Sequence, residues 1–327
     1  MASLLPGPLK TAEHIRRSGL KVIFPFYHAV SNHILPHTLH LYKSRSVAQF
    51  ESDLDYLLGY FTPVRMSEFL EEGMPNDRHK PPLVLSLDDG LIQCYEELMP
   101  LLLKKGIPAT FFLNNDFIDN KDLFFRFKVS LLLEHMSGVS AAELKQAADL
   151  LSCKVAGLRK RLLGINYPDR ELTEQIAELW SYSYSEYLVK DPVYLSTGQI
   201  NEMLQKGFEF GAHGFDHPHF ASIPAKNSRE HIRQSMEDLQ VRFKLDYRYF
   251  AFPFSDYGVK DKTIEELFKH DIIDAGFGTA GLKDDKWKNY YQRVPMELGN
   301  FDAKAVLRGE LKRRYLRLRF GKNNTLR

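Results

Sequence analysis

The sequence predicts an α/β fold built on a parallel sheet or barrel, and three observations support this prediction. Strand, helix and strand patterns follow one another at short spacing between residues 83 and 113. The same alternation resumes near residue 196 and continues to residue 278. The segment between them, at about 116–195, has an almost wholly helical pattern and few turn residues. Because strands that alternate with helices pair in parallel, we expect one domain over residues 1–327 that carries a helical insertion.

The first elements are short. An apolar run at 21–30 predicts a buried strand despite its proline. Ser46 suits the N-cap of a helix that ends at Leu58, because apolar residues recur there at helical spacing. A strand at 61–64 and a helix at 67–72 follow.

The central repeat has the clearest boundaries. A strand at 83–87 precedes a helix at 93–105, whose last turn carries two lysines and which Gly106 ends. A strand at 109–113 completes this unit. The other expected elements are a helix at 196–207, a strand at 208–212, a helix at 228–243 and strands at 249–252 and 275–278.

Charge and cysteine content narrow the class of protein. The formal net charge is only +2, so nothing global indicates a nucleic-acid partner, and we expect none. The two cysteines, Cys94 and Cys153, are too few for a disulfide framework and suit a reducing compartment. Residues 1–7 lack the pattern of a signal peptide, and the apolar runs are too short to span a bilayer. We therefore expect a cytoplasmic location.

Two motifs at strand ends carry the candidate chemistry. Asp88-Asp89-Gly90 follows the strand at 83–87, and a His-x-x-x-His-Pro motif, His213 to Pro218, follows the strand at 208–212. Active sites of α/β folds lie at such strand ends. Each motif alone is weak evidence, since paired aspartates often form caps or turns and histidine pairs arise by chance. We assign the second pair, His33/His37, to chance.

Together, and in this order, the motifs resemble those of the polysaccharide deacetylases of the NodB-homology type, the carbohydrate esterase family 4. The family motif Thr-Phe-Asp-Asp-Gly corresponds to residues 86–90, and His-Ser/Thr-x-x-His-Pro corresponds to residues 213–218. The resemblance covers roughly residues 22–113 and 195–296. It implies a distorted (β/α)7-type, NodB-like barrel. It also implies hydrolytic removal of an acetyl group, in the first place the N-acetyl of a sugar or glycan precursor.

By the same resemblance, Asp89, His213 and His217 bind a divalent metal ion, and Asp88 is the general base. One carboxylate and two imidazoles leave positions open on the ion, as a catalytic site requires. Such an ion polarises a carbonyl group and makes water more acidic, while a carboxylate that is not a ligand takes the water proton. We expect zinc, with cobalt, nickel, manganese or iron as alternatives.

The chain departs from the family at two motifs. The Arg-x-Pro-Tyr/Phe motif reads Ala251-Phe252-Pro253-Phe254, so its arginine is absent. The N–H of Phe254 still suits an oxyanion donor, because a backbone donor needs no particular side chain. Arg293 is the candidate replacement for the arginine; a surface arginine without this role is the alternative.

The second departure concerns the general acid. The family's C-terminal Leu-x-Leu-His motif is missing, since the last histidine is His270. One subgroup supplies this histidine from its first strand in a Tyr-His pair, which Tyr27-His28 resembles. We therefore expect His28 to protonate the leaving amine; a core histidine at a strand end is the alternative.

A basic helix is expected at about 303–322: six lysine and arginine residues lie within residues 312–322, and apolar residues recur at helical spacing. It suits either contact with an anionic membrane surface or a packed final helix with a solvated basic face.

Three functions follow from these motifs. The first is deacetylation of an acetylated sugar or glycan substrate. The second is a metal-dependent amidase or imidase acting on a small non-sugar amide, which the two departures leave open. The third is a catalytically silent carbohydrate-binding barrel, against which the intact Asp-His-His set argues.

Overall fold

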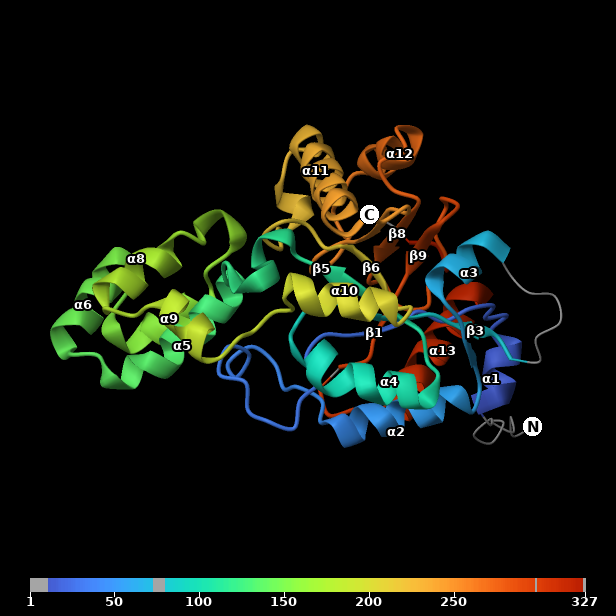
Figure 1. The fold of residues 1–327 in the computed structure, drawn as a ribbon, viewed down its shortest axis with the longest axis horizontal. Helices are drawn as coiled ribbons and strands as arrows, with labels where there is room; N and C mark the ends of the chain where they lie inside the picture. The colour runs from blue at the N-terminus through green and yellow to red at the C-terminus, as the bar shows by residue number, and fades with distance from the viewer. Residues whose placement is uncertain (1–10, 73–79, 298, 326–327) are drawn as a thin grey trace, which may run out of the picture.

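The computed structural model describes residues 11–72, 80–297 and 299–325. Residues 1–7, on which the expectation of no signal peptide rests, lie outside them. Figure 1 shows a barrel with a helical lobe on one side. The barrel sheet has the strand order β10-β1-β4-β5-β6-β7-β8-β9, and neighbouring strands are parallel. The strands are β1 (Pro25–Tyr27), β4 (Leu85–Leu87), β5 (Ala109–Leu113), β6 (Glu209–Ala212), β7 (Tyr249–Ala251), β8 (Ala275–Gly278), β9 (Tyr290–Gln292) and β10 (Val294–Pro295).

One bent strand nearly closes the barrel. Only Arg293 separates β9 from β10. β9 pairs with β8 at Gly278↔Gln292, whereas β10 pairs with β1 at Pro25↔Val294. If β9 and β10 are counted as one strand, the 8-stranded sheet becomes a ring of seven. The distorted (β/α) barrel is therefore confirmed.

Alternation along β4 places Ser86 and Asp88 inside the barrel, because every second residue of a strand faces the same side. Leu85 and Leu87 belong to the large core between the sheet and the outer helices. Val84 belongs to the separate inner cluster. Ser86 and Asp88 are in phase with Val84, so the strand ends with a carboxylate in the mouth of the barrel.

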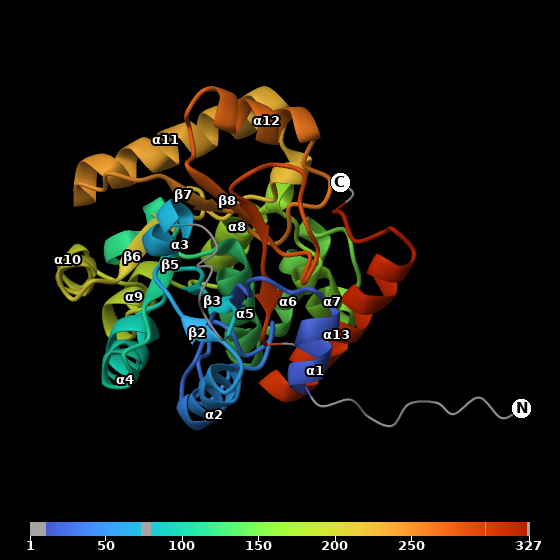
Figure 2. The same ribbon diagram turned by 90° about the vertical axis from the view of Figure 1, so that its right-hand side faces the viewer.

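The outer helices cover the barrel on all sides, with α11 and α12 on one face and α2 and α4 on the opposite face (Figure 2). Ser46 and Ser196 form capping boxes, and Gly106 ends α4 in the left-handed conformation, as expected. These helices are α1 (Thr11–Arg17), α2 (Val47–Leu58), α3 (Met66–Glu72), α4 (Met99–Lys105), α10 (Thr197–Gln205), α11 (Ala225–Phe243), α12 (Asp261–Lys269) and α13 (Ala303–Arg319). A small sheet of β2 (Thr62–Pro63) and β3 (Pro82–Leu83) lies apart from the barrel sheet.

Some elements differ from the expected pattern. The first strand has three residues instead of the ten residues 21–30. A π-helical turn, Cys94–Leu98, precedes α4: Met99 N–H bonds to Cys94 O, and the next residue, Pro100, has no N–H to donate. The bent strand at the end of the barrel and α12 were not expected.

The chain between β5 and α10 forms the lobe beside the barrel in Figure 1. Its helices are α5 (Phe125–His135), α6 (Ala141–Leu150), α7 (Leu158–Leu163), α8 (Leu172–Leu179) and α9 (Tyr184–Lys190). They bury a core of their own. The Asn120 side chain accepts hydrogen bonds from the N–H groups of Val193 and Tyr194 at 2.7 and 2.9 Å, so the two ends of the lobe lie side by side.

The C-terminal basic helix, α13, packs against the barrel. Val306, Leu307 and Leu311 are buried, and Arg314 forms an ion pair with Asp284 at 2.8 Å. These contacts agree with a packed final helix, and membrane contact has no support. Within the described ranges, no helix is both long and apolar enough to cross a bilayer.

Candidate active site

The turn after β4 presents two successive carboxylates at the mouth of the barrel. Asp88 N–H donates to Tyr27 O at 2.9 Å and so extends the pairing of β4 with β1 beyond the strand. Asp89 and Gly90 then take positive φ values of 71° and 64°, a conformation open to glycine and more accessible to aspartate than to most residues. A Cβ atom at Gly90 would also lie 2.7 Å from the Leu113 side chain.

The loop after β6 carries the two histidines, and neighbouring elements fix its backbone. The Asn114 side chain, at the end of β5, donates to His213 O at 2.8 Å. His231 on α11 accepts a hydrogen bond from Phe215 N–H at 2.9 Å. His217 has a φ of 57°, and this turn brings its ring back towards His213, with 4.9 Å between the ring centroids.

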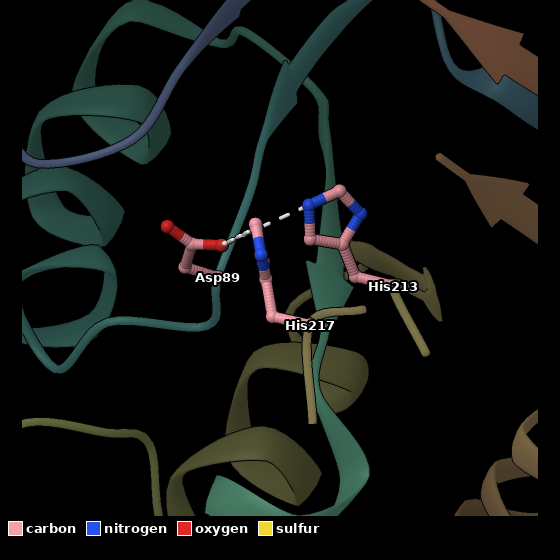
Figure 3. A group of neighbouring side chains, drawn as sticks. All are labelled: Asp89, His213 and His217. Atoms are coloured by element: carbon pink, nitrogen blue, oxygen red, sulfur yellow. Dashed lines mark ion pairs between the residues drawn. The ribbon is translucent and has the colours of Figure 1, made fainter. Parts of the chain in front are cut away.

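Asp89, His213 and His217 converge, as Figure 3 shows. Asp89 Oδ1 lies 3.3 Å from His217 Nε2 and 3.7 Å from His213 Nε2. The three donor atoms all lie within 4.8 Å of one another, and all three residues are buried. His213 Nδ1 bonds to Ala251 O at 2.8 Å, which leaves Nε2 facing the cluster.

This cluster fits a divalent cation. Burial lowers the pKa of His213 to about 4, so its imidazole is neutral near pH 7 and can act as a ligand. Burial alone would raise the pKa of Asp89, but the nearby histidines, His217 foremost, hold it well below its usual range. Asp89 Oδ1 is buried without a hydrogen bond. A buried carboxylate oxygen of this kind needs a positive partner, which a bound cation provides.

Asp88 pairs with Arg293. The two guanidinium Nη atoms donate to the two carboxylate oxygens at 2.6 and 2.8 Å. Arg293 is fully buried and lies over the ring of Phe26 at 4.3 Å. Burial would raise the pKa of Asp88, but the arginine charge holds it below its ordinary value, so the carboxylate is ionised.

His28, the residue after β1, pairs with Glu297. Glu297 Oε2 accepts hydrogen bonds from His28 N–H at 2.8 Å and from its Nδ1 at 2.7 Å. Burial would lower the pKa of His28, but the bond to Glu297 and its charge raise it to about 9. His28 is therefore protonated near pH 7.

A pocket of about 380 Å³ joins these groups. Deep in the barrel, Asp88, His213 and Arg293 are almost wholly buried. The residues that line the pocket come from the barrel rim and from the lobe; they are His28, Leu41, Tyr42, Asp89, Phe124, Arg126, Phe127, His217, Phe254, Pro295 and Glu297.

Phe254 has an unusual backbone for a bulky residue. Its φ is 58°, which is strained for such a side chain. Its ring packs on His217 with 4.6 Å between centroids. Its N–H bonds to no other residue in the part of the chain that the structure describes, so this donor is free for a ligand.

The structure thus brings the candidate residues of the sequence analysis together. His28, Asp89, His217 and Phe254 line the pocket, while Asp88, His213 and Arg293 are buried close to one another. The sequence missed Glu297 and Asn114. Asn114 directly follows a strand end, which is a signal of the same kind as that of Asp88; Glu297 has no local signal. The His33/His37 pair forms no site: His33 is exposed, whereas His37 is buried and bonds to Tyr187 at 3.1 Å.

The barrel and its site define the class, a (β/α)-barrel hydrolase with an Asp-His-His cluster. A family model described as polysaccharide deacetylase matches residues 76–272, more than half of the chain. The chain belongs to the polysaccharide deacetylase family. No curated protein matches the sequence significantly.

Solved structures share the fold at low sequence identity. The deacetylase PplD of Streptococcus pyogenes, in complex with acetate, aligns with a TM-score of 0.57 and 14% identity over 89% of this chain and 98% of its own. IcaB from Ammonifex degensii aligns with a TM-score of 0.55 and 16% identity, over 89% of this chain and 97% of its own. A de-N-acetylase from Aggregatibacter actinomycetemcomitans aligns with a TM-score of 0.51 and 15% identity, over 85% of this chain and 96% of its own.

Proposed function

We propose that this protein is a metal-dependent deacetylase that hydrolyses the N-acetyl group of an amino sugar in a glycan or glycan precursor. One observation carries the proposal: two groups whose pKa values are shifted in opposite directions flank the Asp-His-His cluster. His28 lines the same pocket as Asp89 and His217, and Asp88 lies buried 3.9 Å from His213. Asp88 is an ionised carboxylate held by Arg293, and His28 is a protonated imidazole held by Glu297. Two titratable groups with pKa values pushed apart are typical of an acid–base pair.

Asp88 is the general base in this proposal. Arg293 binds one lone pair of each carboxylate oxygen, and the second lone pairs remain available to accept a water proton. The arginine also fixes the plane of the carboxylate, so it is a positioning residue for the base.

Asp89, His213 and His217 would hold the divalent ion, zinc in the first place. When bound, such an ion polarises the acetyl carbonyl and makes water more acidic. Asp89 has a carboxylate separate from that of Asp88, so ligation and proton transfer fall to different residues.

The remaining steps fall to His28 and Phe254. His28 delivers a proton to the leaving nitrogen, which an amide needs before its C–N bond breaks. The free N–H of Phe254 donates to the oxygen that gains negative charge. The aromatic side chains around the pocket, Tyr42, Phe124 and Phe254, suit the apolar face of a sugar ring better than a small linear amide.

The test is acetate release after removal of metal and separate addition of zinc, cobalt, nickel, manganese or iron. The substrates are N-acetylglucosamine oligomers, O-acetylated sugars and small non-sugar amides. Metal-dependent release from the N-acetylated sugars supports the proposal. Release from the non-sugar amides alone would mean an amidase, and sugar binding without release would mean a silent carbohydrate-binding barrel.

Two variants separate the roles of the paired aspartates. Asp88→Asn should abolish hydrolysis and keep the metal, because only the base is neutralised. Asp89→Asn should lose the metal as well, as metal analysis of the purified variants would show. Asp246→Asn, at an exposed position before β7, is the matched control. Loss of metal from Asp88→Asn alone would reverse the two assignments.

A further inference from the structure

The lobe contributes a positive charge to the active-site pocket. Arg126, in the first turn of α5, lines the pocket together with Phe124 and Phe127. The side chain is half-buried. Among the residues that line the pocket, it is the one with a permanent positive charge.

The partners of Arg126 within the protein are neutral. Its Nη1 donates to Leu163 O, at the end of α7, at 3.2 Å and to Ile165 O, just after α7, at 3.3 Å. Burial lowers its pKa, and no nearby charge within the described ranges opposes this effect. The guanidinium remains charged near pH 7, since arginine does not lose its proton in proteins.

Two other cations of the lobe have carboxylate partners. Lys128, two residues further along α5, bonds to Asp122 and Glu174, each at 2.6 Å. Arg170 lies 3.4 Å from the carboxylate of Asp216. Arg126 differs from both, because no carboxylate among the described residues lies within ion-pair distance of it. A half-buried charge without a counter-ion is costly, and a ligand anion would remove this cost.

We propose that Arg126 recognises an anionic group, a phosphate or a carboxylate, on the acetylated sugar that occupies this pocket. Both Nη1 donors are engaged, and Nε and Nη2 keep N–H groups that bond to no described residue. These two groups form one edge of the guanidinium, with which arginine can bind phosphate or carboxylate in bidentate fashion. The inference rests on the proposed deacetylase function and extends it: the substrate is a charged sugar unit, not a neutral one.

Binding by isothermal titration calorimetry tests this inference. The full-length protein is used without metal, so that no turnover occurs and no ion binds the anion directly. The three probes are N-acetylglucosamine, N-acetylglucosamine 1-phosphate and N-acetylmuramic acid. At least one charged sugar should bind roughly 10- to 100-fold more tightly than the neutral sugar, the range of a hydrogen-bonded charge. The two charged probes distinguish phosphate from carboxylate.

Arg126→Gln should remove the preference for the charged sugar, and Arg126→Lys should keep part of it, because lysine keeps the charge but not the planar fork. Arg161→Gln is the matched control: it removes the same charge from α7, where the side chain bonds to Leu151 O and does not line the pocket. Thermal unfolding of each variant checks that the lobe stays folded.

Equal affinity for charged and neutral sugars would overturn the inference, as would undetectable binding of both charged sugars. An equal loss of preference in Arg161→Gln and Arg126→Gln would overturn it too. Acetate release is a separate measurement that decides the deacetylase assignment, so the two proposals can fail independently.

Discussion

At the scale of single residues, Glu297 sets the orientation of the His28 ring and raises its pKa. Its Oε2 accepts from both the backbone N–H and Nδ1 of His28. This pair of bonds fixes the ring and leaves Nε2 without a partner within the described residues, available to a ligand. A carboxylate that holds one nitrogen and frees the other prepares a histidine for proton transfer.

Replacement of His28 by alanine should depend on the leaving group. We expect amide hydrolysis to fall by roughly 10²–10⁴-fold, because nitrogen must be protonated as it leaves. Activated esters should lose less, since their leaving groups need no proton. Steady-state rates on both substrates check this, with His33→Ala as the control at an exposed position. Equal losses on both substrates would remove His28 from the role of acid.

Replacement of Glu297 by glutamine should move the pH profile. The pKa of His28 is raised to about 9, so the acid form is present below this pH and the rate should fall as pH rises through it. Glutamine removes the charge that raises the pKa, while burial, which lowers it, remains. The alkaline limb of kcat should therefore move to lower pH in a profile from pH 6 to 10. An unchanged alkaline limb would show that a group other than His28 causes the fall in rate.

At the scale of elements, the lobe contacts the loop that carries the two candidate metal ligands His213 and His217. Tyr167, in the 3-10 turn Tyr167–Asp169, donates to the carboxylate of Asp216, with distances of 2.9 and 2.7 Å to its two oxygens. Asp216 directly precedes His217. The inserted helices thus position a candidate ligand as well as line the pocket.

We expect Tyr167→Phe to weaken zinc binding by about 10- to 100-fold, the usual effect of losing a group that orients a metal ligand. Competition with a coloured chelator measures this affinity. Tyr182→Phe, another tyrosine of the lobe, serves as the control. Unchanged zinc affinity in Tyr167→Phe would show that the loop keeps its shape without the lobe.

The elements that the sequence predicted best are those with local signals at both ends. β4, β5 and α4 have apolar runs bounded by the Asp88 turn, Gly106 and similar residues. The bent strand was missed because Gln292 and Arg293 read as surface residues and Pro295 argues against a strand. These polar residues are buried by contacts with distant strands, which a local pattern does not contain.

The same difference between local signals and distant contacts separates the site residues that the sequence could indicate from those that it could not. Asp88, Asp89, His213 and His217 lie in compact motifs that follow strands, so the sequence alone was enough to propose them as candidates. For Arg293 the sequence left two alternatives open: a replacement for the missing family arginine, or a surface arginine without this role. Glu297 is one of 42 acidic residues, and only its contact with His28, 269 positions away, distinguishes it.

At the scale of the whole molecule, metal binding and stability should be linked. A ligand that binds only the folded state stabilises it, by about 2.7 kcal/mol at 100 times its Kd. We therefore expect a chelator to lower Tm by several degrees and added zinc to restore it. Differential scanning calorimetry measures the shift, and Asp89→Asn should abolish it. An equal response in that variant would place the ion elsewhere.

The bent strand also orders events during synthesis. Asp89, His213 and His217 are all made before residue 218, so a chain still leaving the ribosome already contains every residue of the proposed cation site. Arg293 and Glu297 come much later: Arg293 lies 205 positions after Asp88, within the bent strand that completes the ring, and Glu297 follows that strand. An unfinished chain therefore lacks the residues that bind Asp88 and His28. Under the proposed function, we expect hydrolytic activity only after the barrel has closed.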